Sequence, residues 1–136
     1  MTLTDTGPLV ALIDQNDSSH AKCVYAVKHL PKGQLVSTWP CFTEAMYLLF
    51  RDVGYAGQLA IWKLYQARGL VLYDLGTDET RRMAELMEKY QDTPMDLADA
   101  SLIASAEQLG IKRIFTLDRD FFVYRLADGT ALEVVP

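Results

Sequence analysis

The stretch Met95–Phe121 reads MDLADASLIASAEQLGIKRIFTLDRDF, and its pattern decides the fold. The spacing predicts one helix over Asp96–Leu109, which Gly110 can end. Arg113–Leu117 then reads as a short buried strand. A helix followed closely by a buried strand is the unit from which parallel α/β sheets are built.

Two acids on that helix have an unusual position. A polar face is expected from Ser101, Ser105 and Gln108, and at about 100° per residue Asp96 and Asp99 fall on the opposite side, toward the core. A carboxylate there loses hydration, which is costly unless a cation or hydrogen bonds replace it. Asp99 is the harder of the two to explain, because its neighbours in the sequence are apolar.

The rest of the chain repeats the alternation of short strands and helices. Further strands are expected at Thr2–Thr4, Gln34–Ser37, Leu70–Tyr73 and Leu132–Val135. Further helices are expected at Pro8–Ile13, at Ser19–Leu30, from a cap at Thr38 to Asp52, at Ala56–Ala67 and at Asp78–Tyr90. This alternation favours an α/β fold with a mainly parallel sheet, and right-handed crossovers place helices on both faces.

Length and composition bound the class of protein. The 136 residues are expected to form a single domain over residues 1–136, and half of them are apolar. The net charge of −5 argues against a broad basic surface for nucleic acid, although cations held by clustered carboxylates would invert the local field. No membrane span or signal peptide is expected. Cys23 and Cys41 sit in no CxxC pair, so we expect reduced, buried thiols in a cytoplasmic protein.

Four acids are placed by this pattern near one edge of the sheet. Asp5 and Asp118 follow strands, whereas Glu44 and Asp99 lie in the first turns of helices. Carboxyl ends of parallel strands share one edge, so these side chains are expected to converge. At about 5 Å and an effective dielectric near 20, each carboxylate pair repels by roughly 3 kcal/mol, which Mg²⁺ or Mn²⁺ would neutralise. The alternation of residues places the side chains of Thr116 and Asp118 on the same side of this segment. The Thr116 hydroxyl could therefore hold the Asp118 carboxylate or a metal-bound water.

Each acid taken alone also has an ordinary structural explanation. Asp5 could be a turn or N-cap residue, and Glu44 could complement a helix dipole. Asp96 is expected to be the N-cap of its helix. Asp118 and Asp120 could be turn residues after a strand. The set of acids is therefore more informative than any one of them.

Aromatic side chains are frequent in the middle of the chain. They could form a stacking platform for bases, but their helical spacing favours core or subunit contact. These residues are Trp39, Tyr47, Tyr55, Trp62 and Tyr65. The inward-facing residues of two helices are expected to be Ala21, Val24, Tyr25 and Val27 in one, and Phe42, Met46, Leu49 and Phe50 in the other. The apolar surface of Phe42–Phe50 and Tyr55–Tyr65 exceeds what so small a chain buries alone, so we expect a two-fold dimer.

Four motifs follow one another along the chain in a recognisable order. They are Asp5-Thr6-Gly7-Pro8-Leu9, Glu44 within TEAMYLL, Ala98-Asp99-Ala100-Ser101-Leu102-Ile103-Ala104, and Thr116-Leu117-Asp118-Arg119-Asp120-Phe121. In this order the chain resembles the PIN domain, in particular the small toxins of prokaryotic type II toxin–antitoxin systems. The resemblance covers nearly the whole chain, and the spacing of the motifs is more specific than any one of them.

The resemblance implies a three-layer α/β/α sandwich with a central, mainly parallel sheet of four to five strands. It also implies a Mg²⁺- or Mn²⁺-dependent ribonuclease that forms a homodimer and is inhibited by a cognate antitoxin. By this resemblance the catalytic acids are Asp5, Glu44, Asp99 and Asp118, of which Asp5, Asp99 and Asp118 are metal ligands. Supporting roles next to them are implied for Thr6, Asp96, Thr116 and Asp120, and either Asp96 or Asp120 could instead be a direct metal ligand.

Two other functions are consistent with parts of the pattern. A Mg²⁺-dependent phosphohydrolase of small substrates also uses an acid after the first strand, but it needs a second acid two residues later, where this chain has Gly7. An acidic-pocket binding module without turnover is the non-enzyme alternative, which four intact acids disfavour. The expected chemistry is metal-assisted hydrolysis of RNA phosphodiester bonds.

Overall fold

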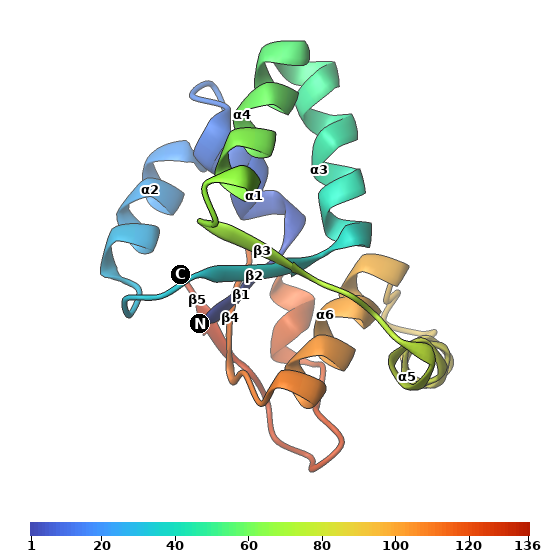
Figure 1. The fold of residues 1–136 in the computed structure, drawn as a ribbon. Coiled ribbons are helices and arrows are strands. Elements are labelled where there is room, and N and C mark those ends of the chain that lie inside the picture. Colours follow the sequence, from blue (N-terminus) through green and yellow to red (C-terminus); the bar gives the residue numbers. More distant parts are fainter.

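The strands of the chain form one parallel sheet. The computed structural model describes residues 1–136. Its five strands lie in the order β3-β2-β1-β4-β5, and every neighbouring pair is parallel (Figure 1). The strands are β1 (Thr2–Thr4), β2 (Leu35–Thr38), β3 (Leu70–Tyr73), β4 (Arg113–Phe115) and β5 (Glu133–Val135). The expected α/β architecture is confirmed, with a sheet that is wholly parallel.

Helices cover both faces of the sheet, which makes a three-layer α/β/α sandwich (Figure 1). One core packs Phe42 and Ile61 with Leu70 of the sheet, and the other packs Leu102 with Ile114. The helices are α1 (Thr6–Ile13), α2 (His20–His29), α3 (Trp39–Asp52) and α4 (Tyr55–Gln66) on one face, and α5 (Thr77–Lys89) and α6 (Leu97–Leu109) on the other. None of these helices has both the length and the apolar character needed to cross a bilayer.

The carboxyl edge of the two central strands brings distant parts of the sequence together. Thr4 of β1 is in register with Phe115 of β4, and the Asp5 amide donates to the Phe115 carbonyl at 3.0 Å. α1 begins immediately after β1 because the Asp5 carboxylate caps it, accepting from the Thr6 amide at 2.7 Å. The residues that follow β1 and β4 therefore lie side by side.

The helix α6 is buried over most of its surface, and the expected polar face is wrong for two of its three residues. Ser101 and Ser105 are fully buried, and only Gln108 is exposed. Both hydroxyls are satisfied inside the core: Ser101 Oγ donates to the Ala98 carbonyl at 2.6 Å and Ser105 Oγ donates to the Ser101 carbonyl at 2.7 Å. Ser101 Oγ also lies 2.6 Å from the hydroxyl of Thr38, the expected cap of α3.

Several side chains on the outer helices also differ from expectation. Tyr25 and Phe50, expected inside, are 67% and 61% exposed, because α2 and α3 turn these faces to the surface and no further layer covers them. Of the aromatic residues expected in core or subunit contact, Trp39, Tyr47, Tyr55 and Trp62 are exposed in the single chain. The rings of Trp39 and Trp62 nevertheless pack edge-on against the buried Phe42 ring. The expected burial of Cys23 and Cys41 is confirmed, and both are free thiols.

Candidate active site

Three carboxylates from distant parts of the chain converge at the carboxyl edge of the sheet. Asp5 follows β1, Asp99 lies in the first turn of α6, and Asp118 comes after β4. One carboxylate oxygen of each lies within 4.8 Å of the others. Asp5 and Asp99 are buried, and Asp118 is half-buried. The structure thus brings together the three acids expected to be metal ligands.

The chain after β4 holds two of these acids through one hydroxyl. Thr116 Oγ1 donates to Asp5 Oδ2 at 2.9 Å and accepts from the Asp118 amide at 3.0 Å. This turn also ends β4 at Phe115, two residues before the expected end. Of the two roles expected for Thr116, a hydrogen bond to the Asp118 carboxylate is wrong, because the hydroxyl donates to Asp5 instead. The other role, holding a metal-bound water, stays a prediction.

The carboxylates of Asp99 and Asp118 are oriented by backbone amides of two neighbouring acids. Asp96 is the N-cap of α6, as expected, and accepts from the Asp99 amide at 2.8 Å, while its own amide donates to Asp99 Oδ2 at 3.2 Å. The Asp120 amide donates to Asp118 Oδ1 at 2.9 Å. Neither Asp96 nor Asp120 belongs to the group of oxygens within 4.8 Å.

No basic side chain neutralises these carboxylates. None of the ion pairs in the chain includes Asp5, Asp99 or Asp118. Burial raises the pKa of Asp5, and the nearby charges of Asp118 and Asp96 raise it further, against hydrogen bonds that lower it. Burial, followed by the charge of Asp96, raises the pKa of Asp99 well above its ordinary value. The cluster is therefore strained in its fully ionised form and suits a bound cation.

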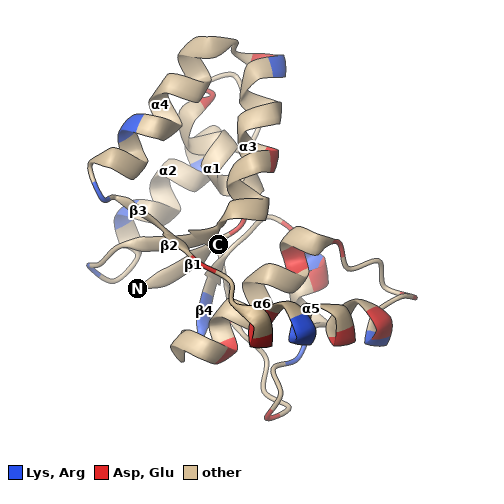
Figure 2. Ribbon diagram, turned by 45° about the vertical axis from the view of Figure 1, so that its right-hand side comes forward, with Lys and Arg blue, Asp and Glu red and all other residues tan.

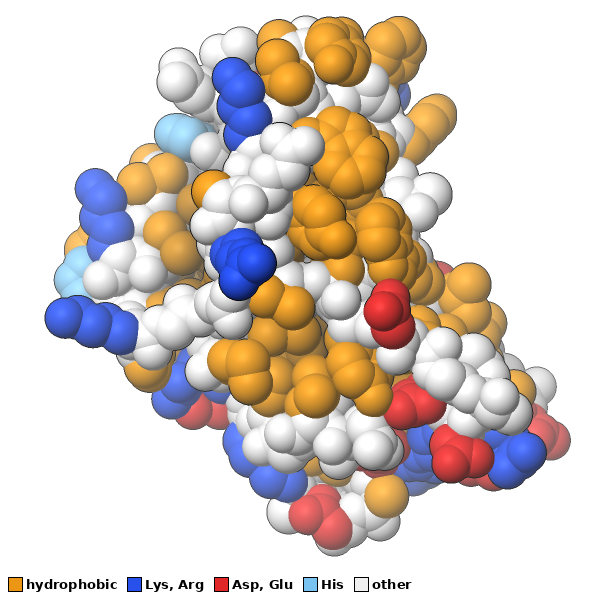
Figure 3. Space-filling model, viewed as in Figure 1, with side chains coloured by type: hydrophobic (Ala, Val, Ile, Leu, Met, Phe, Trp, Pro, Cys, Tyr) orange, Lys and Arg blue, Asp and Glu red, His pale blue; other side chains and the backbone are white.

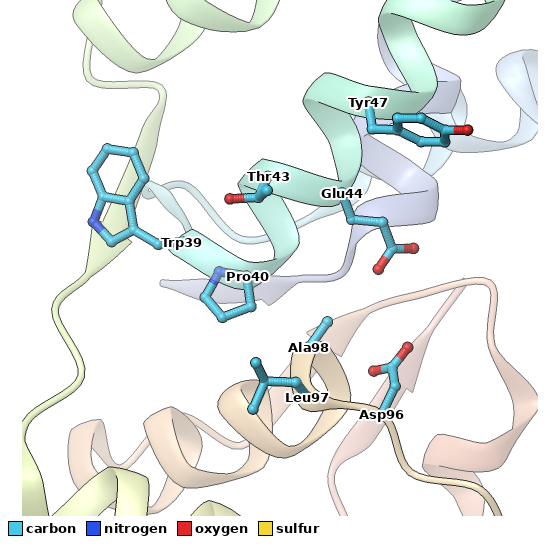
Figure 4. A pocket seen from close by; sticks show the side chains of 8 residues that line it. All are labelled: Trp39, Pro40, Thr43, Glu44, Tyr47, Asp96, Leu97 and Ala98. Carbon is cyan, nitrogen blue, oxygen red and sulfur yellow. The ribbon is translucent and has the colours of Figure 1, made fainter.

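Glu44 faces the same cavity from α3 but stands apart from the cluster. It lines an open cavity of about 280 Å³ together with the three acids and Asp96, and Figure 4 shows its carboxylate pointing toward Asp96 across the gap between α3 and α6. Burial, then the charges of Asp96 and Asp5, raise the pKa of Glu44. All four expected acids thus line one cavity, although only three approach closely.

Thr6 and Tyr124 differ from what the sequence pattern suggests. The Thr6 hydroxyl donates to the Cys41 carbonyl at 3.3 Å, so it fixes α1 against α3 and makes no hydrogen bond to an acid. Tyr124, which no motif points to, is fully buried with a hydroxyl that has no hydrogen-bond partner. Burial and then the charge of Asp99 raise its pKa. The sequence could have indicated Tyr124, because it lies three residues after Phe121, which ends the last acidic motif. The two rings are in contact in the structure.

Comparison with known proteins identifies the family to which this arrangement belongs. Residues 2–126 match the PIN domain family. The chain belongs to the PIN domain family. This PIN domain is 28% identical over 135 residues to Ribonuclease VapC26 of Mycobacterium tuberculosis (strain ATCC 25618 / H37Rv). The match covers 98% of this chain and 99% of that protein.

Solved structures share this PIN fold. The crystal structure of Mycobacterium tuberculosis VapC20, a sarcin-ricin loop cleaving toxin, matches with a TM-score of 0.86 at 18% identity and 100% coverage of both chains. VapBC2 from Rickettsia felis, bound to a DNA fragment from their promoter, matches with a TM-score of 0.67 at 14% identity over 99% of this chain and 98% of that chain. A toxin–antitoxin complex from Klebsiella pneumoniae matches with a TM-score of 0.62 at 20% identity over 89% of this chain and 90% of that chain.

Proposed function

We propose that this PIN domain is a Mg²⁺- or Mn²⁺-dependent endoribonuclease and the toxin of a toxin–antitoxin pair. The observation that carries the proposal is the set of three carboxylates within 4.8 Å, with no basic side chain paired to any of them. Family membership and the relative named a ribonuclease support the same reaction class. In this proposal residues 1–136 act as one nuclease domain in the cytoplasm.

The donor set fits a hard divalent cation. Asp5, Asp99 and Asp118 offer carboxylate oxygens, and the close group contains no imidazole or thiolate, which favours Mg²⁺ or Mn²⁺ over zinc. These three residues would hold the ion. When bound, the ion would lower the pKa of a water and stabilise the negative charge that develops on the phosphate.

The surrounding residues keep the carboxylates in position. Thr116 fixes one Asp5 oxygen, the Asp96 amide fixes one Asp99 oxygen and the Asp120 amide fixes one Asp118 oxygen. Each carboxylate is therefore held in one orientation, so binding an ion costs little further side-chain entropy. Glu44 is the acid left outside the cluster, and its raised pKa suits it to accept a proton from the attacking water.

A direct assay tests the proposed activity. Purified protein is expected to cleave single-stranded RNA in Mg²⁺ or Mn²⁺ and to lose this activity in EDTA, because without the ion nothing offsets the repulsion between the carboxylates and the phosphate. Products are read on a denaturing gel, and Asp92→Asn, which changes an exposed acid away from the cavity, serves as the control. Cleavage that persists in EDTA would exclude the metal mechanism. Hydrolysis of small phosphate esters with RNA left intact would favour the phosphohydrolase alternative.

The proposed assembly rests on the outer faces of α3 and α4. Figure 2 shows few charged residues on these helices, in contrast to α5, and Figure 3 shows hydrophobic side chains gathered over them. The exposed residues are Tyr47, Phe50, Val53, Tyr55, Leu59 and Trp62. Apolar surface of this extent is typical of an interface, so we assign it to a two-fold homodimer. The antitoxin is assigned as a second partner because a solved structure with the same fold is described as a toxin–antitoxin complex.

Phe50→Glu is expected to convert the dimer to a monomer. A carboxylate at a residue that is 61% exposed costs little in the free chain, but in an apolar interface it would be buried without a partner. Light scattering after size exclusion measures the mass over a range of concentrations. Tyr25→Glu, at an equally exposed aromatic residue on α2, is the matched control. A parent protein that is monomeric at every concentration would contradict the assignment.

A further inference from the structure

A groove continues from the acidic cavity along the gap between α3 and α6. It has a volume of about 680 Å³ and is lined by Trp39, Tyr47 and Leu97, among others (Figure 4). Glu44 and Asp96 line both this groove and the acidic cavity, so the two depressions adjoin. The groove therefore lies directly beside the carboxylates.

A second depression adjoins the acidic cavity on its other side. It has a volume of about 210 Å³, and it shares Leu117 and Asp118 with the acidic cavity. Lys22, Arg119 and Phe122 also line it. Both cations are exposed, and neither forms an ion pair with a carboxylate of the chain. This depression therefore offers uncompensated positive charge next to an otherwise acidic site.

Trp39 is held in place although it is at the surface. It is 41% exposed, and its Nε1 donates to Asp74 Oδ1 at 3.2 Å. Its ring meets the buried Phe42 ring edge-on, with centroids 5.5 Å apart. An indole fixed in this way can stack with a planar group at a small cost in conformational entropy.

We propose that single-stranded RNA crosses the site along these three depressions, with a base against Trp39 on one side and a backbone phosphate at Lys22 and Arg119 on the other. This inference rests on the proposed ribonuclease function and adds the path of the substrate. The pattern fits nucleic acid because aromatic surface and free cations flank a site for a metal-bound phosphate. Glu44 and Asp96 also line the groove and would repel a phosphate there, so the path places a base in the groove and the phosphate at the cations.

The aromatic end is tested by two substitutions of one residue. Trp39→Leu keeps an apolar side chain but removes the ring, whereas Trp39→Phe keeps a ring. Binding of a fluorescein-labelled single-stranded oligoribonucleotide is measured by anisotropy in Ca²⁺, with a gel to verify that the RNA stays intact. Trp39→Leu is expected to weaken binding roughly five- to 150-fold, the range for loss of one stacked base, and Trp39→Phe is expected to weaken it much less. Equal affinity of Trp39→Leu and the parent would overturn the proposal.

The basic end is tested by the salt dependence of the same binding. Lys22→Gln is expected to reduce the slope of log Kd against log salt by about 0.7, the contribution of one phosphate contact on a single strand. Lys63→Gln, at an exposed lysine on α4, is the matched control and should leave the slope unchanged. An unchanged slope in Lys22→Gln would place the strand elsewhere.

The remaining outcomes separate this inference from the proposed function. If the parent binds RNA but cleaves none in Mg²⁺ or Mn²⁺, the proposed function fails, while weaker binding by Trp39→Leu still supports the path. If the parent cleaves RNA and Trp39→Leu cleaves it with the same KM, the path is wrong and the function stands. If Trp39→Leu keeps full RNA affinity but forms no dimer or escapes its antitoxin, the groove binds protein, and the inference is overturned.

Discussion

Asp99→Asn is expected to abolish RNA cleavage and yet to melt at a higher temperature than the parent in EDTA at alkaline pH. Loss of activity should reach at least about a hundredfold, because residues that only support a metal ligand already account for ten- to a hundredfold. The gain in stability follows from geometry. With oxygens within 4.8 Å, each ionised pair repels by roughly 3 kcal/mol at an effective dielectric near 20, and the amide removes one charge.

The substitution leaves the local hydrogen bonds possible. The Asp96 amide donates to an Asp99 oxygen, and an asparagine oxygen can accept the same bond. The measurement is a set of melting curves in EDTA and in Mg²⁺, in which about 1 kcal/mol corresponds to a shift of roughly 4 °C for a domain of this size. Mg²⁺ should stabilise the parent and Asp92→Asn by mass action, and Asp99→Asn much less. A mutant that melts lower in EDTA with an unchanged Mg²⁺ response would mean that Asp99 is an ordinary structural acid.

The metal-free protein is expected to lose stability as the pH rises from about 5 to 9. Burial raises the folded-state pKa of Asp99 and of Asp5, so between the unfolded and folded pKa values the folded chain binds more protons than the unfolded chain. The stabilisation that comes from protonating Asp99 and Asp5 in the folded chain is complete below the pKa of these groups in the unfolded chain. It is lost as the pH rises through their higher pKa in the folded chain. Each unit of difference in pKa corresponds to about 1.4 kcal/mol.

Added Mg²⁺ is expected to reverse this trend. The ion binds the ionised carboxylates, so its affinity should increase with pH, and the stabilisation by Mg²⁺ should be largest where the metal-free protein is weakest. Thermal melts at several pH values between 5 and 9, with chelator and with Mg²⁺, measure both trends. Asp99→Asn should show a flatter pH profile in chelator, because it lacks one of the buried carboxyl groups whose pKa is raised. A metal-free stability that rises over this range would contradict the assigned pKa directions.

The sequence alone determines the architecture of this protein because the relevant signals are local. Periodicity places all five strands and all the main helices, and Asp96, Thr38 and Gly110 mark helix ends through caps that depend only on neighbouring residues. Asp99 is also a local signal, since a carboxylate among apolar residues on the inner side of a helix needs compensation. Because the predicted sheet is parallel, Asp5 and Asp118, which follow two of its strands, are expected at the same edge.

Tertiary structure alone decides which polar groups meet. Ser101 and Ser105 look like an exposed face, but they are buried because their hydroxyls find partners in the same helix and in Thr38, which lies 63 positions away in the sequence. Thr116 holds Asp5 because β1 and β4 are neighbours, a contact between residues 111 positions apart. Periodicity likewise cannot tell whether the apolar side of a helix meets another layer, and for Tyr25 and Phe50 the packing leaves that side uncovered. These outcomes depend on which helices and strands pack against one another. The local sequence around a residue does not determine which elements those are.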